Sequence, residues 1–159
     1  MKPIDEKLYD KQLEASAATI IGQIVFSLSR FEFNLGLYLR NAISREDPGA
    51  VDPLISRLSF KSKVDALREV VQHKFSTNEP CLAEFKQWLS EIDAFRAKRN
   101  SFVHGRWTPH YAEQQVINTA PGLRNNASRR YSLAELQSEL DGANEIIERF
   151  YSWCRKWPI

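Results

Sequence analysis

The sequence predicts an all-α fold, an up-and-down bundle of four to five helices with an irregular segment or short hairpin inserted before the last helix. Long stretches carry apolar residues every three or four positions, the period of a helix that buries one face. Only 6 Gly and 7 Pro occur in 159 residues, which argues against an all-β chain with a turn about every ten residues. This length suits one core, so a single domain over residues 1–159 is expected.

The first helix is expected from about residue 5 to residue 44. Its apolar positions are Ile21, Ile24, Val25, Leu28, Phe31, Leu35 and Leu39. A turn at residues 46–49 ends it, because Pro48 disfavours helix in the residue before it and Gly49 tolerates positive φ. A second amphipathic helix is expected from Phe60 to Phe75.

The third helix begins near Pro80, since proline suits the first turn, and Gly105 ends it. Its stripe consists of Leu82, Phe85, Leu89, Ile92, Phe95, Arg99 and Phe102. From Gly105 to Tyr131 the helical period disappears, and a loop or short hairpin is expected. This insert is a candidate basic surface, because Glu113 is outnumbered by Arg106, Arg124, Arg129 and Arg130.

The last helix starts with a capping box, Ser132-Leu-Ala-Glu135, in which hydroxyl and carboxylate satisfy otherwise unpaired amides. Its stripe is Leu133, Leu136, Leu140, Ala143, Ile147, Phe150, Cys154 and Trp157. Four such helices can bury their stripes together only as a bundle, so these side chains are expected to form the core.

Net charge, cysteine content and the length of apolar runs limit the classes of function that the chain can have. With 22 Lys+Arg against 20 Asp+Glu, the net charge of +2 excludes a protein that coats nucleic acid, and an anionic partner must bind locally. Cys81 and Cys154 lie far apart and fit neither a zinc site nor a redox pair, so no metal or cofactor is expected, and Cys154 is expected in the core. Without a signal peptide or an apolar run of membrane length, a soluble, cytoplasmic protein with no membrane contact is expected.

Arg99 is the unusual residue on the third stripe. Its neighbours on that stripe are apolar, so its guanidinium is expected partly inside, where an unpaired cation is costly. Glu32 similarly continues the apolar stripe of the first helix. We therefore expect Arg99 and Glu32 to pair across the first and third helices.

Asn100 and His104 are four residues apart and share a helix face, with Arg99 to one side. Such a group at a helix end suits a phosphodiester: imidazole moves the proton of a ribose 2′-hydroxyl, and arginine stabilises charge on phosphate oxygens. One histidine does not supply both base and acid. A two-fold homodimer that brings two such ends together would supply both.

The segment from Arg99 through Asn100 to His104 resembles the signature of the HEPN superfamily, an arginine, four to six residues and a histidine at the end of the third core helix. Together with Ser29-Arg-Phe-Glu32 and residues 60–67, the resemblance covers roughly residues 15–107. It implies a metal-independent endoribonuclease of a toxin or defence system, with RNA or nucleotide as ligand and an antitoxin protein as a further partner. Several toxins of this family carry a modified tyrosine two residues after the histidine, where this chain has Arg106, so occlusion by the antitoxin is the alternative control.

Catalysis is therefore expected from Arg99, Asn100 and His104, with Glu32 in support. Substrate binding is expected from Arg96, Arg106 and Trp107, although Trp107 also fits a role as a cap on the bundle end. Two alternatives remain open: a non-catalytic module of the same fold that binds RNA, a nucleotide or a protein, and a structural bundle with a chance motif. A second match, Arg68 to His73, is interpreted as chance because it lies inside a helix and has an acidic residue after the arginine.

Overall fold

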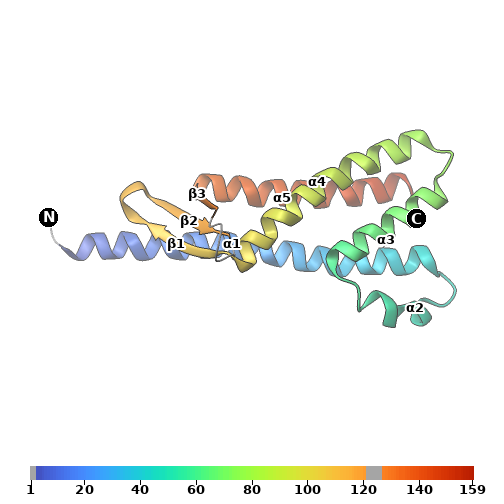
Figure 1. Ribbon diagram of the computed structural model, residues 1–159, viewed down its shortest axis with the longest axis horizontal. Helices are drawn as coiled ribbons and strands as arrows, with labels where there is room; N and C mark the ends of the chain where they lie inside the picture. The colour runs from blue at the N-terminus through green and yellow to red at the C-terminus, as the bar shows by residue number, and fades with distance from the viewer. Residues whose placement is uncertain (1–2, 121–126) are drawn as a thin grey trace. The chain divides into compact units, whose positions relative to one another are not determined.

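The computed structural model describes residues 3–120 and 127–159, with side chains from residue 10 onward. The described chain is mostly helical, with five α-helices and a small sheet between the fourth and fifth (Figure 1). The expected all-α class is therefore correct for most of the chain and wrong for the insert, which forms a three-stranded antiparallel sheet.

Four helices match the sequence periodicity closely: α1 (Pro3–Ile43), α3 (Phe60–Lys74), α4 (Glu79–His104) and α5 (Leu133–Lys156). Local side chains fix their starts, as when the Asn78 carboxamide oxygen accepts from the Cys81 amide at 3.1 Å at the start of α4. The predicted capping box of α5 is present: the Glu135 amide donates to the Ser132 hydroxyl at 3.2 Å, and the Ser132 amide donates to the Glu135 carboxylate at 2.7 Å.

A fifth helix, α2 (Pro48–Ile55), occupies the segment that begins in the predicted turn. Pro48 stands at its first turn, where the missing amide costs nothing, and the Asp47 carboxylate accepts from the Ala50 amide at 3.2 Å. The predicted end of α1 is therefore correct, whereas the short helix after it is not predicted by the sequence pattern.

The sheet has the order β1-β2-β3, with β1 (Arg106–His110), β2 (Gln115–Thr119) and β3 (Ser128–Ser132). The pairing is antiparallel and in register: Arg106 lies opposite Thr119, and Thr119 opposite Ser128. One strand more is present than in the expected hairpin. Of the four arginines of the predicted basic surface, Arg124 lies outside the described residues.

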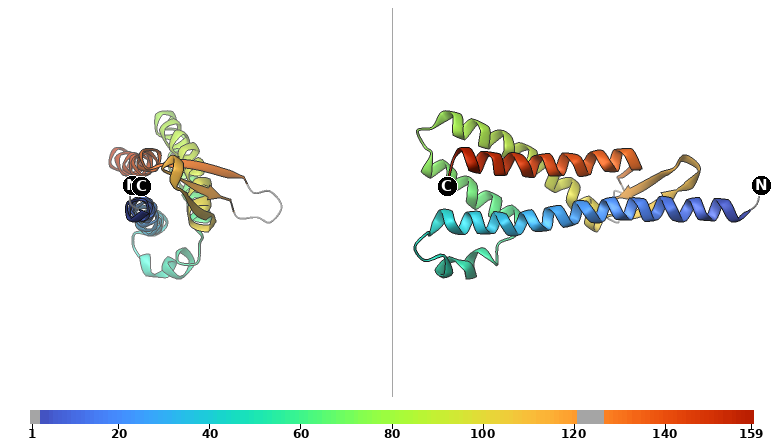
Figure 2. Two further views of the ribbon diagram at one scale, coloured as in Figure 1. Left: turned by 90° about the vertical axis from the view of Figure 1, so that its left-hand side faces the viewer. Right: turned by 180° about the vertical axis from the view of Figure 1, so that it is seen from behind.

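The chain divides into two compact units, Met1–Ser27 with Ala94–Glu145 and Leu28–Asp93 with Ile146–Ile159. We describe each by itself. The first unit contains the start of α1, the end of α4, the sheet and the start of α5, and in Figures 1 and 2 its sheet lies beside α1. The second contains the rest of α1 with α2, α3, the start of α4 and the end of α5.

The core of the first unit joins the sheet to α4. Phe102 packs edge-to-face on Trp107 and Tyr131, with ring centroids 5.4 and 5.5 Å apart. Val116 and Tyr131 are each only 4% exposed, so one face of the sheet is buried. This packing fixes the strand that comes directly after the end of α4.

The core of the second unit is aromatic and centres on Phe31, whose ring lies edge-on to those of Phe60, Trp88 and Phe150. Figure 2 shows α2 and α3 beside this part of α1. Cys154 is buried as expected, and burial raises the pKa of its thiol to about 12. Among the described residues, no helix is long and apolar enough to cross a membrane.

Candidate functional site at the end of α4

The end of α4 carries the three residues predicted to act on a phosphodiester. Asn100 and His104 are exposed on the helix surface, one turn apart, and Arg99 is half-buried beside them. The expectation that Arg99 lies partly inside is confirmed. The arrangement offers an imidazole, a carboxamide and a guanidinium at one helix terminus.

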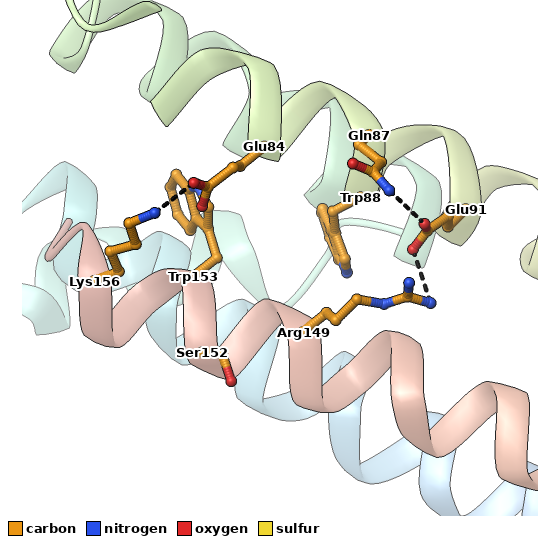
Figure 3. A pocket seen from close by; sticks show the side chains of 8 residues that line it. All are labelled: Glu84, Gln87, Trp88, Glu91, Arg149, Ser152, Trp153 and Lys156. Carbon is orange, nitrogen blue, oxygen red and sulfur yellow. Dashed lines mark hydrogen bonds and ion pairs between the residues drawn. The ribbon is translucent and has the colours of Figure 1, made fainter. Parts of the chain in front are cut away.

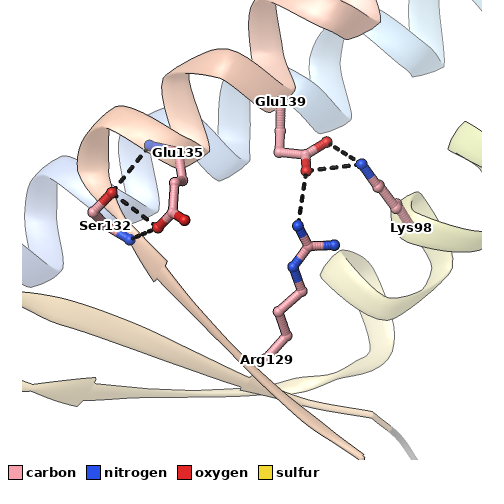
Figure 4. Close-up of polar contacts among 5 residues, drawn as sticks. All are labelled: Lys98, Arg129, Ser132, Glu135 and Glu139. Atoms are coloured by element: carbon pink, nitrogen blue, oxygen red, sulfur yellow. Dashed lines mark hydrogen bonds and ion pairs between the residues drawn. The ribbon is translucent and has the colours of Figure 1, made fainter.

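Arg99 differs from Lys98 and Arg129 in having no described carboxylate partner within the first unit. Its guanidinium donates to the Asn100 carboxamide oxygen at 3.4 Å, and within the first unit no described carboxylate pairs with it. In contrast, the carboxylate of Glu139, 13% exposed, binds the Lys98 ammonium at 2.7 Å and the Arg129 guanidinium at 3.8 Å (Figure 4). Lys98 and Arg129 thus share a single carboxylate, whereas the guanidinium of Arg99 has no described carboxylate partner within the first unit.

The turn from α4 into β1 is held by a contact between Ser101 and Asn118 that the sequence did not predict. Asn118 of β2, 3% exposed, accepts a hydrogen bond from the Ser101 hydroxyl and donates one to the Ser101 carbonyl at 3.1 Å. A Cβ on Gly105 would lie 2.3 Å from that carbonyl and 2.6 Å from the Asn118 amide nitrogen, so only glycine fits. An asparagine inside a short apolar strand was the signal that could have pointed to this contact.

Arg106 and Trp107 lie on opposite faces of β1, because successive strand residues alternate. Arg106 is exposed, and its cross-strand neighbours are Thr119 on β2 and, beyond it, Ser128 on β3. Among the described residues, no carboxylate pairs with Arg106. Trp107 faces the core, where its indole N–H donates to the Phe102 carbonyl at 3.0 Å. This position fits the role of Trp107 as a cap.

The other predicted residues lie in both units. Arg96 is half-buried on α4 in the first unit. Glu32 belongs to the second unit, where it pairs with Lys63 of α3 at 3.6 Å, so its pairing with Arg99 of the first unit stays a prediction. His73, from the match interpreted as chance, is exposed on α3.

A pocket of about 250 Å³ lies between α4 and α5 in the second unit (Figure 3). Its acidic side chains come from α4 and its basic ones from α5: Glu91 pairs with Arg149 at 3.1 Å, and Glu84 with Lys156. At its base the Trp88 indole donates to the Ile146 carbonyl at 3.1 Å. Because its charged side chains are paired with one another and the Trp88 indole N–H is already bonded, this groove is interpreted as part of the packing between α4 and α5.

Comparison of the chain with protein-family models, with curated proteins and with solved structures returned no match. Among the described residues, no three His, Cys, Asp or Glu side chains gather in a way that could hold a metal ion.

Proposed function

We propose that the chain is a HEPN-like, metal-independent endoribonuclease that acts as a homodimer, with toxin or defence activity. The observation that carries the proposal is the exposure of Asn100 and His104 beside Arg99, a cation without a described carboxylate partner. A histidine buried in the core would be unable to reach a substrate phosphate, whereas an exposed His104 can.

In the proposed reaction, His104 of one subunit removes the proton of a ribose 2′-hydroxyl, and the oxygen attacks the adjacent phosphorus. The bond from phosphorus to the 5′-oxygen breaks, and the second subunit's His104 protonates the leaving oxygen. The products are a 2′,3′-cyclic phosphate and a 5′-hydroxyl. Arg99 stabilises charge on the phosphate oxygens, Asn100 orients the group, and Arg106 binds a neighbouring phosphate.

The first experiment incubates the protein with end-labelled single-stranded and structured RNAs in EDTA and identifies the product termini. Arg99→Ala and His104→Ala should abolish cleavage, whereas Arg68→Ala and His73→Ala, the matched residues of the second motif, should retain it. If the protein is folded and dimeric yet no RNA is cut, the nuclease proposal is wrong and a binding module takes its place.

The composite site is tested by mixing subunits. With a ninefold excess of His104→Ala protein, nearly all wild-type subunits enter mixed dimers, and a site that needs both histidines should lose most of its activity. Undiminished activity per wild-type subunit would show that each subunit acts alone. Mass in solution checks the dimer directly.

A further inference from the structure

A second pocket lies in the first unit, on the face of the sheet opposite Arg106. Its volume is about 350 Å³, at the small end of the range for ligand pockets. The wall from α1 consists of Ala17, Ala18, Ile21 and Gly22, and a Cβ on Gly22 would meet nothing within 4 Å. Small residues on this helix thus leave space that the chain does not fill.

The opposite wall comes from the sheet and is also apolar. Trp107 and Pro109 of β1 and Val116 of β2 line it. The indole N–H of Trp107 is already bonded to the Phe102 carbonyl, so the ring offers the pocket an apolar and aromatic surface. Thr108, between Trp107 and Pro109 on β1, also lines the pocket.

One end of the pocket is acidic. Glu14 is the ionisable side chain among its described lining residues, and it has no ion pair among the residues that the structure describes. Asp10 lies one turn earlier on the same helix face. Desolvation, then the charges of Glu14 and Asp10, raise the pKa of the Tyr111 hydroxyl in the turn after β1, so these carboxylates and the turn lie close together.

Apolar walls with one unpaired carboxylate at the rim select a ligand by charge as well as by shape. A nucleotide fits poorly, because its phosphate would face Glu14 and Asp10. An alkylamine with an aromatic or aliphatic body fits well: its hydrocarbon body covers the apolar walls, and its ammonium group meets the Glu14 carboxylate.

We propose that this pocket binds a small organic cation, an amine with an apolar body, with Glu14 as its charge partner and Trp107 as its aromatic wall. The site does not depend on the nuclease proposal, since it lies on the other face of β1 from Arg106.

The test uses 2-phenylethylamine as probe, with 2-phenylethanol, 3-phenylpropionate and AMP as neutral, anionic and nucleotide comparisons. Binding to the full chain is followed by NMR titration of the tryptophan indole signals. The amine should bind with a Kd of about 1 mM, as expected for nine heavy atoms, and about fivefold more tightly than the alcohol. Tighter binding of AMP or of the anion, or no binding of the amine, would overturn the proposal.

Two pairs of variants locate the probe. Gly22→Leu fills the pocket and should abolish amine binding, whereas Gly142→Leu, at another helical glycine with open space around it, should leave binding unchanged. Glu14→Gln should make amine and alcohol bind equally, while Glu145→Gln, at an exposed site on α5, should keep the preference for the amine. Equal effects within either pair would contradict the assignment.

Discussion

Asn118 and Ser101 are joined by two hydrogen bonds that run in opposite directions. The Ser101 hydroxyl donates to the Asn118 side chain, and the Asn118 amide donates to the Ser101 carbonyl at 3.1 Å. Ser101 lies in the last turn of α4, directly after Asn100, and Asn118 lies in the middle strand of the sheet. The pair therefore fixes the terminus that carries His104 against the sheet that carries Arg106.

Replacement of Asn118 by alanine should lower the stability of the protein much more than replacement of Asn100, the exposed residue before Ser101 on α4. Asn118→Ala removes both bonds and leaves the Ser101 hydroxyl without its partner, while the Ser101 carbonyl keeps the Gly105 amide as a donor, so the cost should be about 1–2 kcal/mol. Asn100→Ala, at an exposed position, should change stability by less than about 0.5 kcal/mol while abolishing the proposed cleavage. Urea unfolding measures the stability of both variants. Equal losses of stability would show that the contact of Asn118 with Ser101 does not hold the turn between α4 and β1.

Substitution by alanine should lower the stability of the protein at Gly105 and raise it at Gly142. A Cβ on Gly105 would lie 2.3 Å from the Ser101 carbonyl, so the backbone must shift, and a cost of about 1–3 kcal/mol or more is expected. A Cβ on Gly142, inside α5, meets nothing within 4 Å, and the better helix propensity of alanine should add about 0.5–1 kcal/mol. Thermal unfolding compares the stability of the two variants with that of the wild type. An unchanged stability of Gly105→Ala would contradict the close packing of Gly105 on the Ser101 carbonyl.

The sequence was sufficient where the determining interactions are local. The helical periods, the stop at Gly105 and the Ser132 capping box predicted four helices and the position at which α4 ends. The sequence left open a loop or a short hairpin and did not predict the third strand. The short strands, one of which contains Pro109, are defined by pairing between segments, such as Arg106 with Thr119, and the pattern of a single strand does not show such pairing.

The candidate site was predictable in part for the same reason. Arg99, Asn100 and His104 follow from spacing along one helix. The contact of Asn118 with Ser101 joins residues 17 positions apart, so only the folded chain brings it into view. The pocket beside Trp107 is likewise formed by residues of α1 and of the sheet, which are far apart in the sequence.

The two cysteines should be unreactive in the folded protein. Cys81 and Cys154 are 0% and 7% exposed, and burial raises the pKa of both thiols. With a pKa of about 12 for Cys154, only about one thiol in ten thousand is ionised at pH 8. A disulfide reagent such as Ellman's should react slowly with native protein and release two equivalents promptly in urea. Prompt reaction of either cysteine without urea would contradict the packing of the second unit.

The capping box of α5 should contribute stability that acid removes. Hydrogen bonds from the amide and hydroxyl of Ser132 lower the pKa of the Glu135 carboxyl below its ordinary 4.5 (Figure 4). The unfolded chain therefore binds this proton more readily, so the contribution is complete above about pH 4.5 and is lost as the pH falls through the lowered native pKa. Ser132→Ala should destabilise the protein by about 1 kcal/mol at pH 7 through loss of the hydroxyl, although the amide at this position still binds Glu135. Glu135→Gln removes the titrating carboxyl and should flatten the fall in stability below pH 4.5. Glu145→Gln, at an exposed position later in α5, serves as the control and should keep the wild-type acid profile in urea unfolding measured from pH 3 to pH 7. A Glu135→Gln profile parallel to that of the wild type would show that the box does not couple stability to this carboxylate.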